Sequence, residues 1–200
     1  MLFRSAPIEA VNMGMRFLHD ELMNDPMAIE TVYISVITFA SQAKHETPLT
    51  ELIDFVPPVL QVGGTTSFGK ALTLLDQILK DDIIINMPFQ KGDYKPIVFL
   101  MTDGMPTDRW EAPADKIKQK IAQKEVGIIA LGCGGDVKTD VLKRISNIVL
   151  MMHEITPEKI GEYFKWVSQS ISTASVSVQE MGGVQMPLDE LPSGIVVVLD

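Results

Sequence analysis

The sequence lacks the features that mark secreted and membrane proteins. Its single cysteine, Cys133, excludes a disulfide within the chain and fits a reducing compartment. No apolar run approaches the roughly 18 residues that a membrane span requires. The opening residues also lack the apolar core of a signal peptide. We therefore expect a cytoplasmic globular protein, and 200 residues predict one domain.

Basic residues are too few for a partner rich in phosphate. The chain carries 17 Lys and Arg against 26 Asp and Glu, which gives a net charge of −9. Binding to nucleic acid or to an anionic membrane needs a basic face, so both are excluded as expected partners. An acidic chain is compatible with binding a cation.

Signatures of common enzymes are also missing. The segment from Gly64 to Lys70 does not have the spacing of a P-loop, and no Gly-x-Ser-x-Gly elbow occurs. Cys133 lies between two glycines without a histidine or second cysteine nearby in sequence, so we expect an inert small residue rather than a nucleophile. The sequence predicts a protein that is not an enzyme.

What the sequence does contain is a regular alternation of amphipathic helices and apolar strands, which indicates an α/β fold. One helix is expected to begin at a cap formed by Thr66 or Ser67. The expected helices cover 7–24, 67–79, 113–121, 141–145 and 157–171, and the expected strands cover 31–39, 43–47, 96–101, 126–131 and 148–152.

The most informative stretch runs from Lys95 to Trp110. Ile97 to Met101 are five apolar residues in a row, typical of a strand that is buried on both faces in a parallel sheet. Asp103 follows directly, at the carboxyl end of this strand, where open α/β sheets bind ligands. There its carboxylate can accept hydrogen bonds from loop amides, cap the next helix or bind a cation. Its position alone favours the role of a helix cap.

A second stretch, Gly63 to Leu72, reads Gly-Gly-Thr-Thr-Ser-Phe-Gly-Lys-Ala-Leu. Together the two stretches resemble the von Willebrand factor A (vWA) domain, and within it the bacterial tellurite-resistance branch of TerY-like proteins. The resemblance covers nearly the whole chain and implies a Rossmann-like, doubly wound, mostly parallel sheet with helices on both faces. The segments 7–12, 30–39 and 131–134 also look like this branch.

The resemblance implies a metal-ion-dependent adhesion site (MIDAS), which joins three loops in this family. Thr66 falls on the second loop and Asp103 on the third, as ligands of Mg²⁺ or alternatively of Mn²⁺ or Ca²⁺. The open position on such an ion attracts a carboxylate from a partner protein. The implied function is metal-dependent protein binding, in tellurite resistance or a broader chemical-stress response.

The first MIDAS loop, Asp-x-Ser-x-Ser, and the strand before it are absent. We expect that Met1 is the residue that closes this loop, so that the vWA fold is truncated at its N-terminus. N-terminal analysis of the native protein tests this. Because two ligands bind Mg²⁺ only weakly in water, a metal-free scaffold is the alternative. A receiver-like phosphoacceptor domain is a further hypothesis, although the Thr-Asp-Gly motif fits such a domain poorly.

Three residues after Asp103 are candidates for contact with a partner. Thr107 and Asp108 match the pattern of the TerY-like branch, with hydrogen bonds inside the loop as the favoured alternative. Trp110 is either an exposed contact or, as we prefer, a half-buried lid on the following helix.

The chain is expected to form a vWA-like domain over residues 1–175 and a C-terminal extension over 176–200 that packs on it. Residues 172–191 are polar and predict a surface excursion, whereas 195–199 are a fully apolar strand. This strand either fills the place of the absent first strand or pads a sheet edge. It would fill that place in cis or, in a homodimer, by a swap through residues 194–200.

Overall fold

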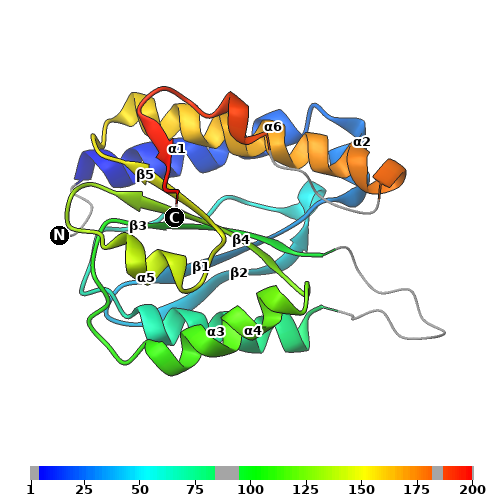
Figure 1. The fold of residues 1–200 in the computed structure, drawn as a ribbon. Helices are drawn as coiled ribbons and strands as arrows, with labels where there is room; N and C mark the ends of the chain where they lie inside the picture. Colours follow the sequence, from blue (N-terminus) through cyan, green and yellow to red (C-terminus); the bar gives the residue numbers. More distant parts are fainter. Residues whose placement is uncertain (1–4, 84–94, 182–186, 200) are drawn as a thin grey trace.

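A computed structural model describes residues 5–83, 95–181 and 187–199 (Figure 1). No helix in these ranges is both long enough and apolar enough to cross a membrane. The helices are α1 (Ser5–Leu22), α2 (Pro26–Thr31), α3 (Phe68–Asp81), α4 (Glu111–Ala122), α5 (Thr139–Lys143) and α6 (Pro157–Met181), and the strands are β1 (Tyr33–Phe39), β2 (Ala43–Glu51), β3 (Ile97–Thr102), β4 (Gly127–Cys133), β5 (Ile148–Met152) and β6 (Ile195–Val197).

The described strands form two separate sheets. One has the order β3-β4-β5-β6, in which β3, β4 and β5 are parallel and β6 runs antiparallel to β5. The other is the antiparallel pair of β1 and β2, at the positions of two predicted strands, although β2 is longer than expected.

Helices cover both faces of this layer of strands. Figure 1 places α1, α2 and α6 on one side and α3, α4 and α5 on the other. One apolar core lies beneath α1 and α6, and a second lies beneath α3 and α4. The predicted doubly wound α/β architecture is therefore confirmed, with a mixed rather than purely parallel sheet.

The burial of the strands differs from the prediction at one place. In β4, residues 128–133 are all buried, as expected for an apolar strand that is paired on both edges. In β3, the side chains of residues 97–101 pack on the cores on both faces of the sheet, as predicted, but they are half-buried rather than fully buried. The physical reason is that β3 pairs with β4 on one edge and with no described strand on the other.

The structure contains one helix that the sequence pattern did not predict, α2, and one that is longer than predicted, α6. The short helix α2 begins where Asp25 accepts a hydrogen bond from the Met27 amide at 3.0 Å, at a position predicted only as the end of the preceding helix. The helix α6 continues to Met181 through part of the predicted polar excursion, past the proposed domain boundary at 175. Ser170 and Thr173 donate to carbonyls four residues earlier, which allows a hydroxyl-rich segment to stay helical.

The C-terminal strand lies at the far edge of the larger sheet. β6 pairs with β5, and the Val198 amide donates to the Val149 carbonyl at 2.8 Å. The hypothesis that this strand fills the place of the absent first strand within its own chain is therefore wrong. The alternative, a strand that pads the sheet edge, is the one observed.

Candidate functional site

The candidate site lies at the carboxyl edge of the sheet, where β3 ends and α3 begins. Asp103 follows β3 directly, and Thr66 lies two residues before α3. The side chain of each is half-buried. Both residues that the sequence predicted as metal ligands are thus in loops at the same edge.

Backbone hydrogen bonds tie these loops together. The Thr107 amide donates to the Thr66 carbonyl at 2.9 Å, so the loop after β3 is joined to the loop before α3. The Ser67 amide donates to the Ala40 carbonyl at 2.8 Å, directly after β1. Residues 66 and 67 therefore connect the ends of the two sheets.

Asp103 is placed where its charge is poorly solvated. Burial raises the pKa of its carboxyl group above the ordinary value for an aspartate. None of the ion pairs found in the described ranges includes it. A half-buried carboxylate with a raised pKa is the kind of group that clusters at functional sites.

This raised pKa gives a testable pH dependence. The folded state holds the Asp103 proton more tightly than the unfolded state, so stability is lost as the pH rises through the folded pKa. We expect Asp103→Asn to be more stable than the native protein at pH 7, because asparagine carries no charge to bury.

The advantage of Asp103→Asn should vanish as the pH falls below about 3.9, the ordinary pKa of an aspartate. Thermal unfolding at several pH values measures the difference. Asp54→Asn, at an exposed position, is the control and should leave the melting temperature unchanged. Equal pH dependence of both variants would contradict the assignment.

The donors at the site fit a hard cation without completing its shell. Thr66 offers a hydroxyl and Asp103 a carboxylate, and oxygen ligands are those that Mg²⁺ prefers. Within the described ranges, no group of three or more His, Cys, Asp or Glu side chains could hold a metal. The two predicted ligands therefore suit the expected ion in kind but supply only part of its coordination.

Asp108, predicted as a partner contact, has a structural role at this edge. Its two carboxylate oxygens accept hydrogen bonds from the amides of Gly69 and Lys70, at 2.9 and 3.0 Å. A carboxylate at a helix N-terminus satisfies free amides and interacts favourably with the helix dipole. Asp108 thus caps α3. Of the two predicted cap residues, Thr66 and Ser67, Ser67 is at the N-cap position, but its side chain makes no capping hydrogen bond.

Trp110 and Thr107, the other predicted contacts, differ in exposure. Trp110 is half-buried, with its ring 6.1 Å from that of Phe68 and the Arg144 guanidinium 5.6 Å from its centroid. Its position fits the preferred reading of a lid. Thr107 is exposed.

Cys133, at the end of β4, is not available as a nucleophile. Its side chain is 1% exposed. Burial raises the pKa of the thiol to about 12, so the thiolate is not populated at neutral pH. This agrees with the inert role predicted from the sequence.

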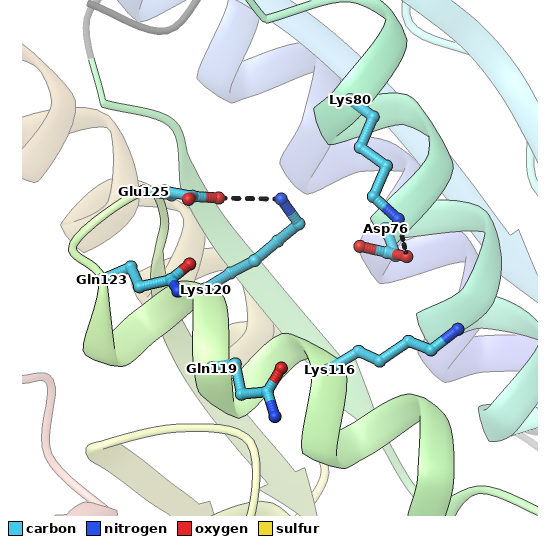
Figure 2. Close-up of a pocket in the computed structure, with 7 residues that line it drawn as sticks. All are labelled: Asp76, Lys80, Lys116, Gln119, Lys120, Gln123 and Glu125. Carbon is cyan, nitrogen blue, oxygen red and sulfur yellow. Dashed lines mark hydrogen bonds and ion pairs between the residues drawn. The ribbon is translucent and has the colours of Figure 1, made fainter.

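A cavity of about 190 Å³ lies elsewhere, between the second halves of α3 and α4 (Figure 2). Lys80 there is about 18 Å along the helix from Phe68, at the start of α3, by the 1.5 Å rise per residue. Two ion pairs line it: Lys80 with Asp76 at 2.6 Å, and Lys120 with Glu125 at 2.8 Å. This cavity is separate from the candidate site.

A sequence model of the von Willebrand factor type A domain matches residues 17–158. The structure of proximal thread matrix protein 1 from the mussel byssus, with a zinc-occupied MIDAS motif, is similar at a TM-score of 0.56 and 21% identity, over 82% of this chain and 43% of that one. No curated protein sequence matches.

A von Willebrand factor type A structure from Catenulispora acidiphila is similar at a TM-score of 0.61 and 16% identity. The similarity covers 83% of this chain and 38% of that one. The chain therefore spans less than half the length of these two structures. At such identities the structural likeness supports the fold alone.

Proposed function

Because the chain belongs to the von Willebrand factor type A domain family, whose members are protein-interaction modules, we propose that it binds a partner protein through a divalent metal ion. The observation that carries this proposal is Asp103, a half-buried carboxylate with a raised pKa at the carboxyl edge of the sheet, beside the loop of Thr66. In this proposal the chain binds and catalyses no reaction.

Thr66 and Asp103 are the residues that would hold the ion, with a hydroxyl and a carboxylate oxygen. The bound ion would supply an open position that attracts an acidic side chain of the partner. Two features of this chain support their cooperation: the bond from the Thr107 amide to the Thr66 carbonyl, and the Asp108 cap on α3. Both hold the loop of Thr66 against the loop that follows Asp103.

The identity of the ion is part of the proposal. Oxygen donors favour a hard cation, so we propose Mg²⁺, with Mn²⁺ and Ca²⁺ as the next candidates. The mussel protein carries zinc in its MIDAS motif, which supports a metal at this place in the fold without identifying the metal here.

The biological setting is proposed from residue patterns alone. Segments 7–12, 30–39 and 131–134 resemble the TerY-like branch, and on this basis we propose a role in tellurite resistance or a broader chemical-stress response. We propose a cytoplasmic location on the same basis.

Calorimetric titration with Mg²⁺, Mn²⁺ and Ca²⁺ tests the proposed function. The titrations use this chain and a version extended upstream by a strand and an Asp-x-Ser-x-Ser loop. We expect weak binding by this chain and tighter binding by the extended version, because added hydroxyl and carboxylate oxygens replace water around the ion. No heat from either protein would leave a metal-free scaffold as the function.

A further inference from the structure

An apolar ridge follows the connection between β2 and α3. Its members are Ile53, Val56, Val59 and Val62, which are 59%, 77%, 73% and 45% exposed. They are four of the nine large apolar side chains that are exposed in the described ranges, and they occur at every third position. Single exposed apolar residues are normal at a protein surface, but a row of them marks an interaction site.

The spacing of three residues identifies the backbone conformation. A polyproline II helix has three residues per turn, so every third side chain lies on the same side. Phe55 has φ −71° and ψ 124°, near the polyproline II values. Pro57 and Pro58 fix their own φ at about −65°, and each keeps the residue before it extended. Residues 55–62, the strap, are therefore an extended segment of this type.

Another side of the strap packs on the protein. Leu52 and Phe55 are 0% and 4% exposed, and Pro58 is half-buried, again at a spacing of three. Leu52 belongs to a core cluster with residues of α1 and α2. The Phe55 ring lies 5.8 Å from the ring of His19 on α1. The segment thus has one buried side and one exposed side, and the apolar ridge is the exposed one.

The strap is held in place at both ends. The Phe55 amide donates to the Leu52 carbonyl at 3.3 Å. The buried Asn12 of α1 accepts from the Leu60 amide at 2.8 Å and donates to the Leu60 carbonyl at 2.9 Å. Between these attachments, the backbone of residues 56–59 makes no hydrogen bond to any described residue. The strap is therefore ordered in advance, which reduces the entropy that a partner must remove on binding.

The two prolines decide which kind of partner fits. Pro57 and Pro58 have no amide hydrogen, so a strand cannot pair with the strap along its length. The free carbonyls can accept hydrogen bonds from a partner, while the apolar ridge needs a groove to enter. Domains that recognise polyproline II segments meet both needs, because their grooves are lined with aromatic side chains. The N–H of tryptophan and the O–H of tyrosine are donors in such a groove.

Charge gives the partner a second feature. The sequence has no Lys or Arg between Lys44 and Lys70, and Asp54 is exposed immediately before the strap. A basic side chain at this end of the groove would complement the carboxylate and fix the direction of the strap. We propose that the strap is a docking site for a protein domain whose aromatic-lined groove binds a polyproline II segment, with a basic residue facing Asp54. This contact uses no metal ion and is independent of the function proposed above.

The first test probes an array of purified WW, SH3 and EVH1 domains with the native chain in the presence of EDTA. Fluorescence anisotropy then measures the affinity of each domain that binds, and we expect at least one to bind. Val59→Ser removes a central side chain of the ridge, so it should raise the dissociation constant at least about tenfold. Because Val59 is 73% exposed, its substitution should leave the melting temperature unchanged.

Val196→Ser is the matched control, since Val196 is a 48% exposed valine in β6, outside the strap. It should bind as tightly as the native chain. Asp54→Lys reverses the charge beside the strap and should weaken binding, so unchanged affinity would overturn the basic residue in the groove. The docking site is overturned if no domain of the array binds, if Val59→Ser binds as tightly as the native chain, or if Val196→Ser weakens binding equally.

Light scattering tests the alternative occupant of the ridge, a second copy of the chain. We expect the native chain and Val59→Ser to have the same molecular mass at every concentration. A native dimer that dissociates in Val59→Ser would show that another copy covers the apolar ridge and would overturn the proposal.

Discussion

Gly69→Ala should lower the free energy of unfolding by about 3 kcal/mol, the upper part of the range for overpacked positions. Gly69 lies in the first turn of α3, against the loop that follows β3. A methyl group there would meet the carbonyl oxygen of Arg109, with the carbonyl carbon at 2.8 Å and Trp110 Cα at 2.9 Å. These are backbone atoms, so relief requires the loop and the helix to move apart.

The same movement would affect the candidate site. It would separate the Asp108 carboxylate from the Gly69 and Lys70 amides that it caps. The loop of Thr66 would then lose its fixed position relative to Asp103, so metal affinity should fall together with stability. Chemical denaturation and calorimetry on the same preparation measure both effects.

Gly161→Ala is the control, because no atom lies within 4 Å of a methyl group at this position in α6. Alanine favours a helix over glycine by about 1 kcal/mol, so this variant should be stabilised. If Gly69→Ala were also neutral or stabilised, the close contact between α3 and the loop would be wrong.

Trp166→Ala should cost about 3–5 kcal/mol, the range for removal of a buried tryptophan. The side chain is 2% exposed and stacks on Tyr163, with ring centroids 5.9 Å apart, and it meets the edge of Phe99 at 6.4 Å. It joins α6 to the face of β3. Its loss would leave a large cavity at the centre of the core beneath α1 and α6.

Trp166→Phe separates packing from hydrogen bonding. The indole Nε1 donates to the Pro187 carbonyl at 3.0 Å, which attaches the C-terminal segment to α6. Phenylalanine keeps much of the apolar contact and loses this bond, so the cost should be smaller, at about 1 kcal/mol for the bond itself. Denaturant unfolding compares the variants, and equal costs would contradict the packing role.

The sequence predicted the framework of the fold because apolar runs and helical spacing are local signals. The runs at 97–101 and 148–152 are the strands β3 and β5, at nearly the expected limits. The end of α6 was missed because its second half is rich in serine, which favours loops on average. In α6, Ser170 donates to the carbonyl four residues earlier, a contact that composition does not reveal.

Of the candidate site, local motifs identified the positions of Thr66 and Asp103 but not their surroundings. The cap on α3 comes from Asp108, 39 residues after Gly69, so no local pattern predicts it. The half-exposure of β3 depends on which strand lies beside it, and this is a property of the sheet rather than of its own residues.

Electron paramagnetic resonance of added Mn²⁺ tests the central claim most directly, because protein binding depletes the signal of the free aqueous ion. The version extended upstream by an Asp-x-Ser-x-Ser loop should deplete this signal. Asp103→Ala and Thr66→Val, in the same background, should both restore it, since each removes one oxygen ligand. Depletion that survives both substitutions would show that the ion binds elsewhere and would contradict the proposed site.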